Sequence, residues 1–386
     1  MQIIIFSTQP WNDSHWTNKQ HIAHRLSQKH EVIYYFDETS LIGRIKEFFT
    51  PPFSRNKFHK LYQKKNPNLH IFQPYSLLPS RFSIMLFKIT KRINLLLLQK
   101  LLNQLNFEEP ILWFYEPTAV YYLDKIDYSF SLYDCVDEYQ TLFNAGNKKY
   151  LDKIAKDETR LLKNTDLVIT TSRPLYKKKK KYNSNTHYIH NVGEASLFKK
   201  ANSEDINIHP DIQNIPAPIV GYHGALSYYK VDFDLIYFIS NSKPDWSIVL
   251  IGDYIDIDKP TLNKLSQAEN IYLLGKKEYR KLPQFIKAFE VCIIPYLINQ
   301  YTTYCFPLKF FEYMATGKPI VTTALPSLEE YKEYIEYSQD KKEFLKYLEN
   351  IIASDKSFSQ SRVNLAQNFT WESRLKKIMK RVHNAR

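Results

Sequence analysis

The chain has 386 residues, 44% of them hydrophobic and 15% aromatic, so we expect a globular protein with two domains rather than one ordinary core. Its three cysteines, Cys135, Cys292 and Cys305, form no C-x-x-C pair, which argues against a disulfide framework or a zinc site and fits a reducing cytosol. The start "MQIIIFSTQ" lacks signal-peptide features, and no uncharged apolar run reaches the roughly 18 residues of a membrane span. These signs predict a cytoplasmic protein.

Positive charge is concentrated in the first half of the chain. The net charge is +13, and residues 1–200 carry 30 Lys/Arg against 18 Asp/Glu. Within them, residues 41–100 hold 12 basic residues and a single acid, Glu47. Such a patch indicates an anionic partner: a membrane surface, a nucleic acid or a phosphorylated substrate.

Short β-rich runs alternate with helical segments along the chain, which predicts parallel sheets with crossover helices. In the first half the expected strands are residues 2–8, 30–36, 69–74, 110–117, 130–138, 165–172 and 186–192. In the second half they are residues 218–226, 246–253, 270–275 and 290–296, with helices over 233–242 and 281–289. The lysine run "YKKKKKY", residues 176–182, is typical of a solvated surface loop.

The domain organisation follows from a polar, Pro-rich interruption of this alternation. We expect an N-terminal Rossmann-like domain over residues 1–200, a linker over 201–218 and a second Rossmann-like domain over 219–368. In open parallel sheets, ligands bind beyond the carboxyl ends of the strands. Each loop that follows a strand is therefore a candidate site.

The stretch "YCFPLKFFEYMATGKPIV", residues 304–321, predicts a helix that begins near Pro307 and ends at Gly317, followed by a buried strand. Lys309 and Glu312 are three residues apart and share one helix face. A cation and a carboxylate beside a helix start, where backbone N–H groups lack partners, suit a phosphorylated sugar or a nucleotide.

The order of "GYHGALSYYK", "VLIGD", the run from residue 270 to 296 and "FPLKFFEYMATGKPIV" resembles the donor-binding domain of GT-B glycosyltransferases of the family 4 type. Similar runs mark bacterial envelope-polysaccharide enzymes, including teichuronic-acid-type transferases. The resemblance implies two Rossmann-like domains around a central cleft, with residues 369–386 forming a helix that crosses back to the first domain. It also implies transfer of a sugar from a nucleoside diphosphate donor, taken here as a UDP-sugar, with retention of anomeric configuration. No Asp-x-Asp pair stands in a donor loop, so no metal cofactor is expected.

The resemblance assigns donor-binding roles to residues of the second half. Glu312 matches an acid that accepts hydrogen bonds from the ribose hydroxyls, and Gly224 matches a glycine beside the diphosphate. Further donor-binding candidates are His223, Lys230, Gly275, Lys276, Phe306, Pro307, Leu308 and Lys309. The segment Gly275–Lys277 matches a loop that faces the base.

Three positions depart from the family pattern. Tyr304 stands where the first acid of a Glu-x7-Glu motif is usual, Ala225 replaces an arginine, and Tyr115 replaces a histidine in "FYEP". We therefore look for a catalytic residue elsewhere, at Asp137 in "YDCVDEY" or at Tyr304. His15, Trp16 and Glu116 are the candidates for the loops that contact acceptor or phosphate.

The basic segment of the first domain gains a role from the same resemblance. The stretch that starts at Ser80 combines an apolar body with Lys88, Lys91 and Arg92, a pattern that favours contact with an anionic membrane surface. A plain core helix is the alternative, especially for Leu95–Leu98. The expected protein is peripheral on the inner face of the cell membrane and acts on a lipid-linked or glycan acceptor.

Two other functions remain open at this point. The same fold serves non-hydrolysing sugar-nucleotide epimerases, and the three departures also allow a non-catalytic sugar-nucleotide binder. Nucleic acid is not an expected partner, because the charge is confined to one patch and no recognition motif accompanies it.

Overall fold

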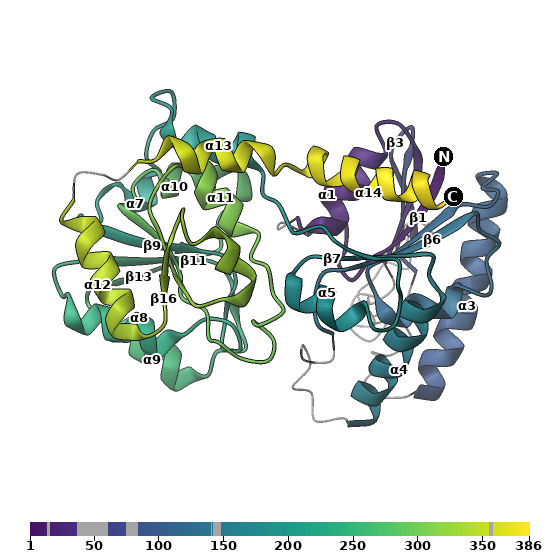
Figure 1. Ribbon diagram of the computed structural model, residues 1–386, viewed down its shortest axis with the longest axis horizontal. Coiled ribbons are helices and arrows are strands. Elements are labelled where there is room, and N and C mark those ends of the chain that lie inside the picture. The colour runs from purple at the N-terminus through teal and green to yellow at the C-terminus, as the bar shows by residue number, and fades with distance from the viewer. Residues whose placement is uncertain (14–15, 37–60, 75–83, 140, 142–147, 355–357) are drawn as a thin grey trace, which may run out of the picture. The chain divides into compact units, whose positions relative to one another are not determined.

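The computed structural model describes residues 1–13, 16–36, 61–74, 84–139, 141, 148–354 and 358–386. The chain divides into two compact units (Figure 1). The first unit comprises Met1–Ile189 and Leu375–Arg386, and the second comprises His190–Arg374. Residues 201–218, which the sequence suggests as a linker, lie inside the second unit.

The first unit is built on an eight-stranded sheet with the order β3-β4-β2-β1-β5-β6-β7-β8. Its neighbours are parallel except for β3, which runs antiparallel to β4. The strands are β1 (Gln2–Phe6), β2 (Glu31–Tyr35), β3 (Tyr62–Asn66), β4 (Leu69–Phe72), β5 (Ile111–Phe114), β6 (Phe130–Cys135), β7 (Leu167–Thr170) and β8 (Thr186–Tyr188). The helices are α1 (Asn18–Leu26), α3 (Ile84–Gln104), η2 (Pro117–Tyr122), α4 (Lys148–Asn164), α5 (Arg173–Lys179) and most of α14 (Trp371–Ala385).

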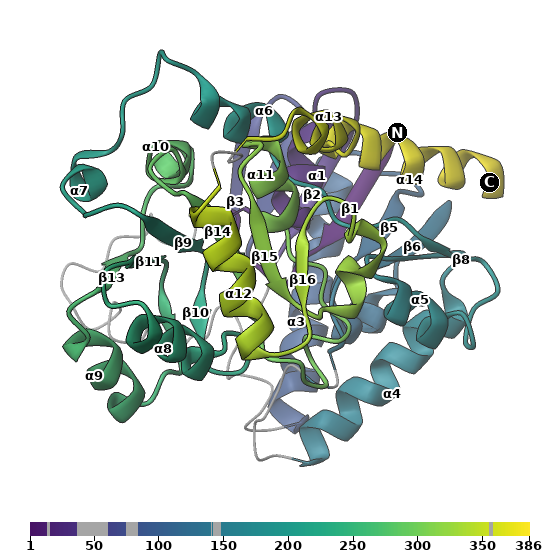
Figure 2. The same ribbon diagram turned by 60° about the vertical axis from the view of Figure 1, so that its left-hand side comes forward.

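The second unit has a six-stranded, fully parallel sheet with the order β13-β11-β9-β14-β15-β16. These strands are β9 (Ile219–His223), β11 (Ser247–Ile251), β13 (Ile271–Gly275), β14 (Val291–Ile294), β15 (Ile320–Thr323) and β16 (Glu336–Ser338), and β10 (Leu226–Ser227) pairs separately with β12 (Tyr254–Ile255). Helices α8 (Phe233–Ser242), α9 (Lys259–Gln267) and α12 (Lys341–Ile352) lie on one side of the sheet, and α10 (Leu282–Ile286), α11 (Lys309–Ala315) and α13 (Gln360–Asn368) lie on the other (Figure 2). The remaining short helices are α6 (Ala195–Phe198), η3 (Lys199–Asn202), α7 (Pro210–Gln213), η4 (Tyr279–Lys281) and η5 (Pro326–Tyr331).

The α/β class and the parallel Rossmann-like sheets expected from the sequence are confirmed. Runs of β-branched and aromatic residues form the central strands: β1 is "QIIIF", and both β9 and β14 are buried along their whole length. Polar residues begin the helices, as at α8, where the backbone N–H of Leu235 donates to Asp232 at 2.8 Å. The antiparallel strand β3, "YQKKN", was not expected, because a polar edge strand carries no apolar pattern.

The expectation that the lysine run is a solvated loop holds only in part: Lys177, Lys180 and Lys181 are exposed, but the start of the run is helical and one lysine is buried. Its first lysines belong to α5, and Lys179 is only 1% exposed. The Lys179 ammonium lies 2.7 Å from Glu158 and 3.1 Å from Glu138, two carboxylates that are also buried. The interior therefore holds a paired charge cluster, and the cost of burying each charge is offset by its partners.

In the part of the chain that the structure describes, no helix is both long enough and apolar enough to cross a membrane.

Candidate active site

The carboxyl end of β9 is the place where the strand order of the second sheet reverses. The chain continues from β9 to β11 on one side, while β14 pairs on the other. Ligands of open α/β sheets bind at such a point, because the loops on the two sides diverge and leave a crevice. His223 is the last residue of β9, and Gly224 follows it.

Gly224 and Gly252 allow two turns to stack directly at this edge. Gly224 has φ of +122°, a conformation that side chains with a Cβ rarely adopt. A Cβ on Gly252 would lie 2.0 Å from the carbonyl oxygen of Gly224. Only glycine fits at position 252, and Gly224 has no side chain to cover its own backbone.

Glu312 is buried beside this edge, on α11. The Tyr279 hydroxyl donates a hydrogen bond to its Oε1 atom, and the His223 Nε2 atom lies 3.3 Å from its Oε2 atom. Burial raises the pKa of Glu312 to about 7, although the hydrogen bond from Tyr279 and the nearby Lys309 both act to lower it. The carboxyl group is therefore poised between its neutral and anionic forms near neutral pH.

Lys309 lies one helical turn before Glu312 and is also buried. Its ammonium sits 3.7 Å from the centre of the Tyr222 ring and 5.2 Å from that of Tyr296. Burial, reinforced by the positive charge of Lys230, lowers its pKa well below the ordinary value for lysine. The aromatic rings hold the Lys309 Nζ atom in place by cation–π contacts.

Gly224 also makes room for this lysine. A Cβ at Gly224 would lie 2.5 Å from the Lys309 Nζ atom and 2.9 Å from its Cε atom. Lys230 approaches the same wall, with its ammonium 5.6 Å from the Tyr301 ring and 5.9 Å from the Tyr296 ring. Two lysines thus share one aromatic wall next to an open backbone.

The segment that follows the first unit closes another side of the site. The Asn191 side-chain amide donates to the Phe306 carbonyl at 2.9 Å and ties this segment to the loop before α11. A Cβ at Gly193 would lie 2.9 Å from the backbone nitrogen of Glu312, so a side chain there would push the segment away. Phe306 is buried, and its ring packs at 5.7 Å from the Phe311 ring.

The other donor-side candidates lie in the loops around this centre. Pro307 is buried, whereas Leu308 and Tyr304 are half-buried in the loop before α11. At Gly275, φ is +66° and an added Cβ would meet open space. Lys276 is partly exposed and pairs with Asp253 at 2.7 Å. The centre of the site therefore consists of His223, Gly224, Lys309 and Glu312, with Lys230 at the aromatic wall.

Sequence reasoning missed three residues of this centre: Tyr279, Asn191 and Gly193. Tyr279 stands two residues after the Gly275–Lys277 segment, but its hydrogen bond spans 33 positions of the chain. Gly193 and Asn191 are single residues in a loop, and no periodic pattern in the sequence marks them.

The acceptor-side candidates follow β1, β5 and β6, three neighbouring strands around the point where the strand order of the first sheet reverses. The Tyr139 hydroxyl, after β6, donates to the carbonyl of Tyr115 at 2.6 Å. Burial raises its pKa well above the ordinary value, and the charges of Asp137 and Glu116 add to the effect. Glu116 is buried with the Thr118 hydroxyl donating to it, and Asp137 is half-buried.

Other candidates of the first unit are packed against neighbouring side chains or fully buried. Trp16 packs against Trp11 and His21, with ring centres 5.0 Å and 5.5 Å away, while His15 lies outside the described residues. Asp134 and Glu138, the other acids of "YDCVDEY", are fully buried. Among the described residues, no group of three or more His, Cys, Asp or Glu side chains could hold a metal ion.

The expected membrane-contact helix is α3, and the structure corrects one of its residues. Lys91 is 1% exposed and directs its ammonium over the Tyr122 and Phe87 rings, each 5.3 Å away, so it cannot reach lipid headgroups. Lys88 and Arg92 are exposed. The outer face of α3, as we call it, also exposes four large apolar side chains: Met85, Ile89, Ile93 and Leu96.

Comparison with known proteins points to one enzyme class. Residues 217–354 match a family model described as "Glycosyl transferases group 1". The "Putative teichuronic acid biosynthesis glycosyltransferase TuaH" of Bacillus subtilis is 26% identical over 298 residues, which cover 71% of this chain and 72% of that protein.

Solved structures share the whole fold at low identity. A sucrose-phosphate synthase from Thermosynechococcus elongatus superposes with a TM-score of 0.73 at 15% identity, covering 99% of this chain and 98% of that one. The Anabaena protein HepE, in complex with UDP and glucose, gives 0.67 at 14% identity and 99% coverage of both chains. An Escherichia coli structure described as trehalose-6-phosphate bound with UDP-2-fluoro glucose gives a TM-score of 0.71 at 11% identity and 98% coverage of both chains. The protein is a glycosyltransferase with the GT-B fold, and residues 217–354 of its second unit match the group 1 glycosyl transferase model.

Proposed function

We propose that this glycosyltransferase takes its sugar from a UDP-sugar and transfers it, with retention of configuration, to a lipid-linked or cell-envelope glycan acceptor. The observation that carries the proposal is the buried pair of Glu312 and Lys309 beside Gly224, whose missing side chain leaves room for the lysine. Two structural neighbours hold UDP or UDP-2-fluoro glucose, and the Bacillus relative is named for teichuronic acid biosynthesis.

Each part of the centre suits one part of a nucleoside diphosphate. An ionised Glu312 accepts hydrogen bonds from two neighbouring ribose hydroxyls, and Tyr279 gives up its own bond or shares the carboxylate. The diphosphate lies over the Gly224 backbone, where Lys309 and Lys230 supply positive charge.

The same lysines assist the departure of the nucleotide. When the bond between the sugar and the diphosphate breaks, negative charge grows on the leaving phosphate oxygen. Lys309 is fixed by its aromatic contacts before this happens, so little rearrangement is needed to stabilise that charge. Tyr304 is the proposed contact for the donor sugar, and Asp137 with Glu116 is proposed for the acceptor hydroxyl.

Calorimetric titration with UDP, GDP and their sugar derivatives tests the donor assignment. We expect UDP to bind the wild type and to bind Glu312→Ala at least about tenfold more weakly, since a charge-assisted hydrogen bond contributes about 1.5–3 kcal/mol. Glu329→Ala, an exposed acid of the same unit, is the matched control. Binding unchanged in Glu312→Ala, or no nucleotide binding by the wild type, contradicts the proposal.

The assay products separate the remaining alternatives. An epimerase would convert the sugar nucleotide into its epimer in the absence of any acceptor. A non-catalytic protein would bind the UDP-sugar but would not cleave it to UDP. Transfer of the labelled sugar to an acceptor glycan is expected instead.

The outer face of α3 is the proposed contact with an anionic membrane. Its exposed apolar side chains stand beside Lys88 and Arg92, which is the composition of helices that lie in the headgroup region. On this proposal the protein acts at the inner face of the cell membrane. In a flotation assay, Ile93→Glu should reduce binding to vesicles that contain phosphatidylglycerol, and equal flotation of variant and wild type would contradict it.

A further inference from the structure

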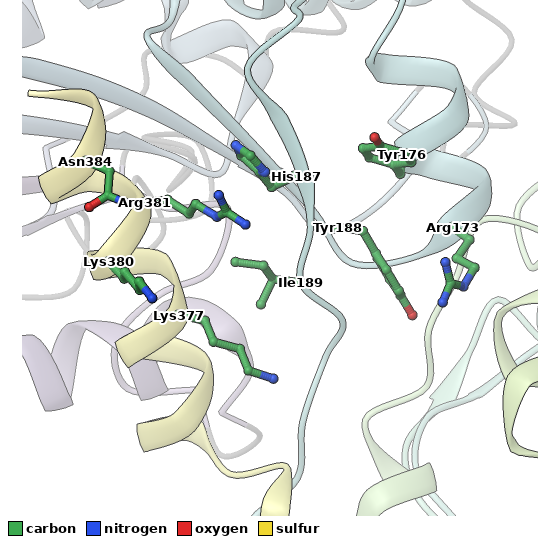
Figure 3. Close-up of a pocket in the computed structure, with 9 residues that line it drawn as sticks. All are labelled: Arg173, Tyr176, His187, Tyr188, Ile189, Lys377, Lys380, Arg381 and Asn384. Carbon is green, nitrogen blue, oxygen red and sulfur yellow. The ribbon is translucent and has the colours of Figure 1, made fainter.

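A second group of cations lies within the first unit. A groove of about 710 Å³ is lined by the first turns of α5, the end of β8 and one face of α14. Figure 3 shows its lining residues, which are Arg173, Tyr176, His187, Tyr188, Ile189, Lys377, Lys380, Arg381 and Asn384. Its volume falls in the range of about 300–1,000 Å³ that is usual for ligand pockets.

The helix α14 presents two distinct faces. Ile378 and Val382 are fully buried, one helical turn apart. Lys377, Lys380, Arg381 and Asn384 repeat at intervals of three and four residues and so share the groove face. In Figure 3, Lys377 and Arg381 extend from the helix toward Ile189 and His187. The cations are therefore gathered by helical spacing and not scattered over the surface.

The opposite side of the groove adds a fixed guanidinium. Arg173 lies over the Tyr188 ring at 4.9 Å, which holds its position. No acidic residue is found among the described residues that line the groove, and neither Lys380 nor Arg381 forms an ion pair with a described carboxylate. Burial, with the positive charges of Arg381 and Lys180, lowers the pKa of His187, as expected in an electropositive groove.

We propose that this groove binds a phosphate or diphosphate group. Four basic side chains from α5 and α14 converge on a groove that has no acid among its described lining residues, and arginine and lysine together are the usual protein partners of phosphate oxygens. The group could be carried by a lipid or be free in solution. Tyr176, Tyr188 and Ile189 provide apolar surface next to the cations, which a lipid-borne diphosphate would use and a free one would not.

Calorimetry with two probes distinguishes these sources. Inorganic diphosphate and farnesyl diphosphate are titrated into the full chain, into the double variant Lys380→Ala/Arg381→Ala and into Lys376→Ala. Lys376 is exposed on α14 but does not line the groove, so it controls for loss of charge on the same helix. Lys380 and Arg381 are also exposed, and an unchanged melting temperature would show that the double variant folds normally.

We expect at least about tenfold weaker diphosphate binding in the double variant, and no change in Lys376→Ala. Tighter binding of farnesyl diphosphate than of inorganic diphosphate would identify a lipid-borne ligand, and equal binding a free one. Diphosphate that binds at the nucleotide centre would still bind to the double variant, which would distinguish it from diphosphate bound in the groove. Absence of binding to the wild type, equal binding to the double variant, or equal loss in the Lys376 control would each overturn the proposal.

Discussion

The buried carboxyl group of Glu312 makes the stability of the second unit depend on pH in a way that one substitution removes. Its pKa is raised from 4.5 to about 7, so the folded state keeps a proton that the unfolded chain releases at lower pH. Between about pH 4.5 and 7, folding becomes less favourable as pH rises, because ionisation favours the unfolded chain. The Glu312 side chain therefore contributes to the free energy of unfolding at low pH, and this contribution is lost as the pH rises to about 7.

Glu312→Gln keeps the size of the side chain and removes the ionisation. The shift of pKa from 4.5 to about 7 corresponds to about 3 kcal/mol. At pH 4 both proteins carry a neutral side chain that can accept a hydrogen bond from Tyr279, so their stabilities should be similar. By pH 8 the variant should have gained about 3 kcal/mol relative to the wild type.

Urea denaturation at a series of pH values, followed by circular dichroism, measures this difference. The free energy of unfolding of the variant minus that of the wild type should rise between about pH 4.5 and 7 and then level off. The same substitution at the exposed Glu329 controls for the introduced amide. A difference that stays constant across this range, or that falls with pH, would refute the argument that burial controls the charge of Glu312.

Three further substitutions test neighbouring contacts. Tyr279→Phe removes the hydrogen bond that lowers the pKa of Glu312, so the pH midpoint of UDP affinity should move upward; an unchanged midpoint argues against the contact. Gly224→Ala should weaken UDP binding at least about tenfold and cost roughly 1–2 kcal/mol in stability, whereas Gly275→Ala, also at positive φ but facing open space, should show only the stability cost; equal affinities would count against the clash. Lys179→Met should lower the free energy of unfolding by about 3–5 kcal/mol in denaturant titrations, because two buried carboxylates lose their partner; a loss below about 1 kcal/mol would contradict the pairing.

Much of the second unit could be predicted from local sequence. "PIVGYH" and "EVCIIPY" form β9 and β14, because short apolar β-rich runs between turn residues have few alternatives in an α/β chain. Gly317, with φ of +68°, ends the helix that carries Lys309 and Glu312, as its place before Lys-Pro suggested. The spacing of those two side chains follows from the helix itself.

The environment of charged residues could not be predicted in this way. Lys91 and Lys179 both stand in basic stretches that suggest solvent, yet each is buried by partners elsewhere in the chain. When the partner of a lysine is tens of residues away, the neighbouring sequence does not indicate that the lysine is buried. For the same reason the surroundings of Glu312, which decide its pKa, depended on the tertiary structure.

The division of the chain has a consequence for biosynthesis. The second unit is one uninterrupted stretch, His190–Arg374, and can fold as soon as it leaves the ribosome. The first unit starts earlier but includes Leu375–Arg386, whose Ile378 and Val382 are fully buried. Its apolar surface under α14 therefore stays uncovered while the whole second unit is being translated. The unit that is synthesised first is therefore the last to be completed.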